Sequence, residues 1–187
     1  MQTLPSQALE AREESSIHGS GVYARQAIAD GDFITEYTGE IIDLPEAIKR
    51  EKARQERKAR GEECCDYLYL VDDDMIIDGR DSGNVARLIN HSCEANCRSD
   101  VLDDRVWIIA AQDIAAGEEL TFDYSYTFRD GLGHPCRCGA ASCLGYIVAK
   151  HQRWRVRRWL KQQPEFARPT QALPQRRRRA KIAGKES

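Results

Sequence analysis

One short segment of this chain concentrates side chains that can do chemistry. It reads Arg87-Leu-Ile-Asn-His-Ser-Cys-Glu-Ala-Asn-Cys97, so guanidinium, amide, imidazole, hydroxyl and thiol groups surround a single apolar Leu-Ile pair. The pattern follows neither the two-residue period of a strand nor the 3.6-residue period of a helix. Two interpretations are open. The segment lines a ligand-binding pocket, or it forms a capped turn whose Asn and Ser side chains bond the local backbone.

A second candidate site lies in the cysteines that follow. Cys136, Cys138 and Cys143 place three thiols within eight residues. Tetrahedral zinc takes four ligands, with sulfur at about 2.3 Å, so a fourth ligand must come from elsewhere. Cys93 is the best candidate, and a metal there would fasten the late cysteine loop onto the polar segment and order both. The alternative is a group of buried thiols without a metal.

The remaining cysteines favour ordinary thiols. The chain has seven cysteines, an odd number, so disulfides cannot pair them all. In a reducing compartment, clustered cysteines are more often metal ligands or buried thiols than disulfides. We interpret the adjacent Cys64 and Cys65 as thiols that bind nothing, and Cys97 as a packing thiol.

Length and hydropathy predict one intracellular domain with tails. The chain has 187 residues, enough for one domain with its own core. The longest apolar run, Val106–Ala111, has six residues, whereas a membrane span needs about 18. Residues 1–12 lack the basic-then-apolar pattern of a secretory signal. We therefore expect no membrane partner, and a cytoplasmic location in a bacterium or a nuclear one in a eukaryote.

Charge is divided unevenly along the chain. Residues 147–187 carry 13 Lys and Arg against 2 Asp and Glu, a net charge of +11, whereas residues 1–146 carry 15 against 28, a net of −13. An acidic body attracts basic partners, and a basic tail attracts polyanions such as nucleic acid. The alternative is a solvated surface with a solubilising tail.

Short apolar runs separated by glycine-bearing turns predict a mainly β domain. The runs are Val22–Ala24, Phe33–Thr38, Ile41–Ile42, Tyr67–Val71, Met75–Ile77, Val106–Ile109 and Leu120–Tyr124. The fourth and fifth runs flank three aspartates and predict a hairpin.

Two helices interrupt this pattern. Asp43 and Glu46 stand at the positions of a capping box, and Gly61 is a stop signal, so a charged and mostly exposed helix is expected between them. A basic helix is expected over residues 151–163. Prolines at 164, 169 and 174 then disfavour regular structure.

Five blocks of the sequence, in order, resemble the SET-domain protein-lysine methyltransferases. The blocks are Ile17–Ala24, Glu36–Glu40, Gly83–Cys97, Gly117–Tyr124 and the cysteine loop that begins at Cys136. Each block alone is a weak signal, and their common order carries the resemblance.

The resemblance implies a mainly β SET-domain fold of the β-clip type. In this fold the segment Gly83–Cys97, called the signature segment below, is threaded under a loop as a pseudoknot. It divides the chain into a flexible leader at 1–14, a SET domain at 15–130 with a charged insert helix at about 44–61, a post-SET zinc loop at 131–149, and a basic helix with a disordered tail at 150–187.

The resemblance also implies the site residues. S-adenosylmethionine would be bound by Ile17, His18, Ser20, Gly21, Tyr67, Asn90, His91 and Leu144. Structural zinc would be bound by Cys93, Cys136, Cys138 and Cys143. The catalytic residues would be Tyr124 and Tyr67. The channel for the substrate lysine would be walled by Tyr69, Phe122 and Tyr126.

The implied function is transfer of a methyl group from S-adenosylmethionine to a lysine ε-amine of a basic protein, a histone or histone-like. Phe122 favours di- or trimethylation, because a Phe at this place leaves room for a partly methylated amine. Two alternatives stay open. One is a SET-fold binding module that has lost turnover, and the other is a nucleic-acid- or chromatin-binding protein that acts through the Arg-rich tail.

Overall fold

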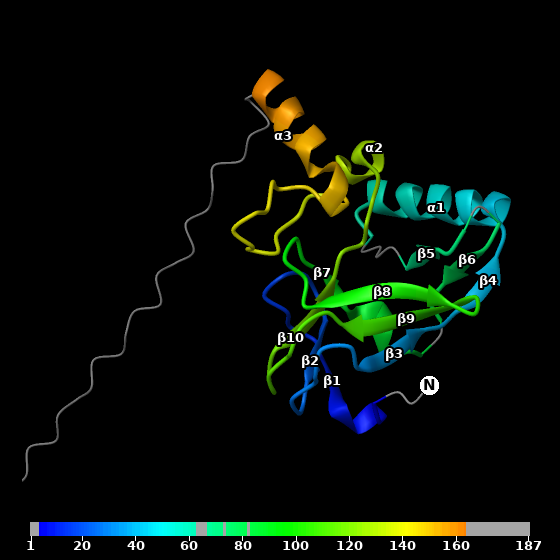
Figure 1. Cartoon of the computed structure of the whole chain (residues 1–187). Coiled ribbons are helices and arrows are strands. Elements are labelled where there is room, and N and C mark those ends of the chain that lie inside the picture. Colours follow the sequence, from blue (N-terminus) through cyan, green and yellow to red (C-terminus); the bar gives the residue numbers. More distant parts are fainter. Residues whose placement is uncertain (1–3, 63–66, 73, 82, 164–187) are drawn as a thin grey trace, which may run out of the picture.

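Three small sheets and one long helix form the body of the protein (Figure 1). The structure, a computed structural model, describes residues 4–62, 67–72, 74–81 and 83–163. Cys64, Cys65 and the tail 164–187 therefore lie outside the described residues. No helix in the described part of the chain has the length and apolar character needed to cross a membrane.

The first sheet brings the signature segment beside the last strand. Its order is β1-β2-β10-β7, and β10 pairs in parallel with β7 through Thr121 opposite Asn90 and Phe122 opposite His91. The strands are β1 (Leu9–Arg12), β2 (Gly21–Ala24), β7 (Asn90–His91) and β10 (Glu119–Phe122). A short 3-10 turn, η1 (Ser6–Ala8), precedes β1, and another, η2 (Val85–Leu88), precedes β7. The segment expected to be a flexible leader thus contributes a strand, which forms four antiparallel pairs with β2.

Of the three sheets, the second supplies the largest share of the buried core. Its order is β3 (Phe33–Tyr37), β9 (Arg105–Ala110) and β8 (Cys97–Leu102). Every residue of β9 after Arg105 is buried. Asp103 and Asp104 join β8 to β9 with φ of 52° and 58°. Two successive positive φ angles match the tight turn that suits the right-handed twist of a hairpin.

The third sheet carries the insert helix. Its order is β4 (Glu40–Ile42), β6 (Ile76–Asp78) and β5 (Leu68–Leu70), so the hairpin predicted from the sequence is present. Helix α1 (Leu44–Ala59) packs on it through Ala47, which joins Ile42 and Ile76 in a small separate core. Asp43 caps α1 by accepting the Glu46 N–H at 2.9 Å. The rest of α1 is charged and mostly exposed.

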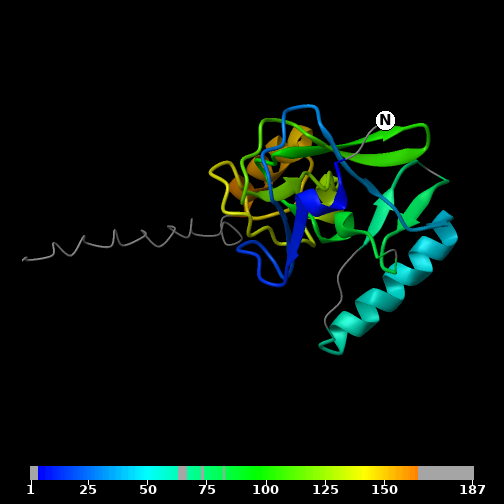
Figure 2. The same cartoon turned by 90° about the horizontal axis from the view of Figure 1, so that it is seen from below.

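The described part of the chain ends in three short helices. They are α2 (Phe128–Gly131), η3 (Lys150–Gln152) and α3 (Arg153–Gln162). Figure 1 shows α2 and α3 above the sheets. Figure 2 shows that α1 projects from the side of the body that carries the third sheet, whereas the loop after Cys136 and α3 lie on the other side. The candidate site lies between these two sides.

Candidate functional site

Tyr124 lies where β7 and β10 end together. Its hydroxyl donates to the Ile89 carbonyl at 2.9 Å, and its backbone N–H donates to Nδ1 of His91 at 3.2 Å. The rings of Tyr124 and His91 are 5.4 Å apart between centroids. The register of two short parallel strands therefore holds the phenol beside the signature segment.

Asn90 ties that segment to the loop before β2. Its buried Nδ2 lies 2.9 Å from the Ser20 carbonyl, 3.1 Å from the His18 carbonyl, 3.1 Å from Ser15 Oγ and 2.9 Å from Glu119 Oε1. One amide nitrogen has two hydrogens, so four acceptors share two donors. Ser15 and Glu119 are not among the residues that the sequence predicts for the site.

Both interpretations of the signature segment hold in part. Some of its polar side chains bond the local backbone, and others line a cavity. Asn84 caps η2 by accepting the Ala86 N–H at 2.7 Å. The Asn96 side chain forms two hydrogen bonds with the backbone of β10. It donates to the Glu119 carbonyl and accepts from the Thr121 N–H, both at 2.9 Å. These polar groups satisfy local structure. Asn90 and His91, by contrast, face a cavity.

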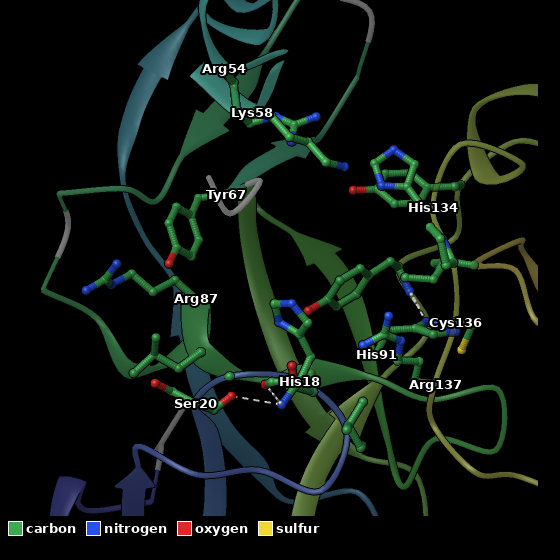
Figure 3. Close-up of a pocket in the computed structure, with 18 of the residues that line it drawn as sticks. His18, Ser20, Arg54, Lys58, Tyr67, Arg87, His91, His134, Cys136 and Arg137 are labelled. Carbon is green, nitrogen blue, oxygen red and sulfur yellow. Dashed lines mark hydrogen bonds between the residues drawn. The ribbon is translucent and has the colours of Figure 1, made fainter. Parts of the chain in front are cut away.

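The cavity has a volume of about 1030 Å³ and gathers residues from distant parts of the chain (Figure 3). Tyr67 lines one side of the cavity, and its backbone is held by a hydrogen bond from Tyr37 Oη to the Tyr67 carbonyl at 2.7 Å. The other side carries Tyr126, whose ring stacks on His134 at 4.5 Å. The predicted site residues that line the cavity are Ile17, His18, Ser20, Tyr67, Asn90, His91, Tyr124, Tyr126 and the predicted zinc ligand Cys136.

Four residues predicted for the cofactor pocket or the lysine channel do not line this cavity. Gly21 is buried in β2, where a Cβ would lie 2.5 Å from Glu119 Oε1. Tyr69 packs on the Tyr37 ring and donates to Ser99 Oγ at 2.8 Å; burial raises its pKa. Phe122 is buried with its ring 4.9 Å from that of Tyr124, and Leu144 follows Cys143 in the cysteine loop.

The lining of the cavity is strongly cationic, a property that the sequence hides because the charges are scattered along the chain. The cations are Arg54, Arg57, Lys58, Arg80, Arg87 and Arg137, and the carboxylate among the described lining residues is Glu13. Arg87 lies over the Tyr67 ring, 5.2 Å from its centroid. In Figure 3, Arg54 and Lys58 of α1 lie above Tyr67 and His134.

The four predicted thiol ligands lie together. The sulfurs of Cys93, Cys136, Cys138 and Cys143 are all within 4.8 Å of one another. A zinc tetrahedron with sulfur at about 2.3 Å from the metal has edges of about 3.8 Å, and Cys93 and Cys136 are 3.9 Å apart. The cluster therefore fits a tetrahedral metal ion.

The surroundings of the thiols support metal binding. Backbone N–H groups of Cys93 and Gly145 donate to the sulfurs of Cys138 and Cys143, each at 3.4 Å. Hydrogen bonds from Cys136 and Cys143 lower the pKa of Cys138. A thiolate stabilised in this way is the form that binds zinc.

His91 separates the thiol cluster from Tyr124. Its Nε2 lies 3.6 Å from Cys93 Sγ, and its Nδ1 accepts the Tyr124 N–H. Burial lowers the pKa of His91, which favours the neutral imidazole. The single side chain of His91 thus links the cluster to Tyr124, so the order of the cluster bears on the position of Tyr124.

The SET-domain family model matches residues 19–125. The chain belongs to the SET-domain family. This confirms the predicted family and its mainly β fold.

The chain is also similar to several larger proteins. It is 41% identical over 137 residues to the histone-lysine N-methyltransferase trithorax of Drosophila virilis, covering 71% of this chain and 3% of that protein. It is 41% identical over 139 residues to the H3 lysine-4 specific histone-lysine N-methyltransferase of Saccharomyces cerevisiae, covering 71% and 12%. For histone-lysine N-methyltransferase set1 of Dictyostelium discoideum the identity is 42% over 135 residues, covering 70% and 9%. The chain thus spans a small part of the length of these relatives.

We predict that this SET-domain protein binds one zinc ion per chain and that Cys136→Ser releases it. A serine hydroxyl is a poorer zinc ligand than a thiolate, so the three remaining sulfurs would lose the metal to a mild chelator. Metal content after dialysis measures this. Cys97→Ser is the matched control, because Cys97 is buried in β8, outside the cluster. Equal zinc retention in both variants would contradict the assignment.

Proposed function

We propose that this protein is an S-adenosylmethionine-dependent protein-lysine methyltransferase. The observation that carries the proposal is the Tyr124 phenol, bonded to the Ile89 carbonyl beside Asn90 and His91, within one cavity. The family and the names of the relatives support it. The proposed catalytic pair is Tyr124 and Tyr67.

The cavity fits a methyl donor of this kind. Its volume of about 1030 Å³ is at the upper end for small-molecule sites. Asn90, His91 and Tyr67, with the loop from Ile17 to Gly21, would hold S-adenosylmethionine, and Leu144 would lie at its edge. When bound, it supplies an electrophilic methyl group. The cationic lining offers a partner for its carboxylate.

The acceptor lysine must arrive as a neutral amine, although its ordinary pKa is about 10.4. Aromatic walls and nearby cations both favour the neutral form. Tyr126 and Tyr124 supply aromatic surface at the cavity. The cations of its lining act in the same direction, except Arg54, whose charge is paired with that of Glu51. The Tyr124 hydroxyl is fixed by one hydrogen bond, so its lone pairs can orient the amine. A separate His or Asp base is not needed.

The direct test is transfer of a labelled methyl group. The protein is incubated with labelled S-adenosylmethionine and a panel of histones and cell lysates, and labelled proteins are mapped to a residue. We expect label on lysine ε-amines. Binding of the donor without release of S-adenosylhomocysteine would instead favour a SET-fold binding module.

We predict that Tyr124→Phe lowers kcat by about 100-fold or more while the protein stays folded. The variant keeps the ring that packs on Phe122 and loses the oriented hydroxyl, and misplacement of a reacting group by about 1 Å costs about that factor. Circular dichroism and turnover measure the two effects. Tyr146→Phe is the control, since Tyr146 packs on Trp159 outside the cavity. A kcat for Tyr124→Phe close to that of the parent would refute the role.

We predict that the product includes di- or trimethyl-lysine and that Phe122→Tyr shifts it toward monomethyl-lysine. Phe122 is buried against Tyr124, so an added hydroxyl would occupy space beside the amine and bind a water or the amine itself. Mass spectrometry of a lysine peptide at long reaction times measures the distribution. Monomethyl product alone from the parent protein would contradict this.

We propose that the substrate is a basic protein, a histone or histone-like, inside the cell. The three relatives described above are named histone-lysine N-methyltransferases. The net charge of −13 on residues 1–146 would steer a basic protein at long range. Peptides of opposite net charge, compared at low and physiological salt, test this preference.

A second candidate function is binding of nucleic acid. Helix α3 contains no acidic residue, and Arg155, Arg157, Arg158 and Lys161 are exposed on it. We predict that Arg157→Gln combined with Arg158→Gln weakens binding to duplex DNA and lowers the salt slope by about 0.9 for each phosphate that the variant no longer neutralises. Fluorescence anisotropy over a salt series measures it. The control neutralises the exposed Arg25 and Lys52, and an equal weakening there would argue against α3 as the binding surface.

A further inference from the structure

Arg153, the first residue of α3, is a buried cation that joins three segments. Its side chain is almost wholly buried. Nε donates to the Val148 carbonyl at 3.0 Å, Nη1 to the Cys93 carbonyl at 2.7 Å, and Nη2 to Asp123 Oδ2 at 3.0 Å. The planar, always charged guanidinium is the side chain that can serve three such acceptors at once. These three hydrogen bonds form a polar junction between Val148, Cys93 and Asp123.

Asp123 connects this junction to the candidate site, because its carboxylate contacts both Arg153 and His91. Its Oδ2 also accepts the Lys150 N–H at 3.1 Å, and its Oδ1 accepts the Ser125 N–H at 3.0 Å. Oδ1 is 3.7 Å from Nδ1 of His91, the atom that accepts the Tyr124 N–H. The carboxylate therefore contacts both the residue after Tyr124 and the imidazole beside it.

The backbone after Tyr124 needs such support. Ser125 has a φ of 56°, in the left-handed region that residues other than glycine seldom adopt. Such a conformation is unfavourable on its own and persists where the surrounding contacts fix it. Here the Asp123 side chain bonds the Ser125 N–H, and Arg153 fixes the Asp123 side chain. This turn sets the direction in which the chain continues from Tyr124 to Tyr126.

Further bonds attach the same C-terminal segment to the strand end. The Ala149 N–H donates to the Tyr126 carbonyl at 2.9 Å, and the Phe128 N–H donates to Gln152 Oε1 at 3.0 Å. Val156 of α3 is also buried. The residues from 148 to 156 are thus packed and bonded against the segment that carries Tyr124 and Tyr126.

We propose that Arg153 is a positioning residue for Tyr124, and that the start of α3 belongs to the catalytic unit. The kinetic part of this inference rests on the proposed methyltransferase function. Arg153 touches no reacting atom in this scheme. It acts through Asp123 on the turn after Tyr124, and through the Cys93 carbonyl on the segment that carries His91.

The test compares Arg153→Met, Arg153→Lys and, as control, the exposed Arg25→Met in the full chain. Methionine keeps much of the apolar stem and removes every hydrogen bond. Lysine keeps the charge facing Asp123 and removes the fixed three-way geometry. With a lysine-containing peptide as substrate, we expect Arg153→Met to lower kcat by about 10- to 100-fold, Arg153→Lys to lower it less, and Arg25→Met to leave it unchanged. The KM for S-adenosylmethionine should change less than kcat.

A second measurement separates positioning from simple stabilisation. Arg153→Ala leaves a space lined by acceptors, so millimolar guanidinium should restore part of its kcat while the same concentration of urea should not. A lower melting temperature with parental kcat per folded molecule would show a structural role only and overturn the inference. If Arg153→Met does not fold, parental kcat in Arg153→Lys would overturn it equally. An inactive parent protein would instead refute the proposed function.

Discussion

The parallel pairing of β7 with β10 is the interaction on which the site depends. Only two residue pairs form it, Thr121 with Asn90 and Phe122 with His91. Parallel neighbours need a long crossover, and the hairpin of β8 and β9, with the loop after it, occupies that part of the chain. The large buried core of the second sheet thus holds a short pairing that would be marginal alone. Asn90 then extends it to the loop before β2, where its amide has four acceptors within reach.

The need of buried polar groups for hydrogen-bond partners explains why residues from distant parts of the chain meet at this site. Burying an amide, an imidazole or a guanidinium is costly unless each finds partners. In the described residues no buried side-chain nitrogen or oxygen lacks a hydrogen-bond partner. Asn90, His91 and Arg153 meet this condition with groups from other segments. Each bond that removes the cost of burial also fixes a segment, so the polar site and the thiol cluster together define a geometry that a small apolar core could not define with the same precision.

Local patterns in the sequence predicted the elements whose causes are local. Asp43 and Glu46 marked the start of α1, and two apolar runs on either side of three aspartates marked the β5–β6 hairpin. The cysteine spacing and the family resemblance were enough to group Cys93 with the other three thiols. Ser15, Glu119 and Arg153 were missed, because their role lies in bonds across 60 or more residues in several cases. No residue pattern near Arg153 distinguishes it from the other arginines of α3; only its burial does.

Two electric fields of opposite sign act on a ligand that approaches this protein. Residues 1–146 carry a net charge of −13, which acts at a distance, whereas six cations and Glu13 line the cavity. Salt screens the first field over about 8–10 Å, and it screens partly buried charges much less. A basic protein can therefore be attracted to the surface and still meet a cationic interior. For an amine that must lose its proton before it reacts, that interior is favourable, because neighbouring positive charge lowers the lysine pKa and leaves the neutral form to enter.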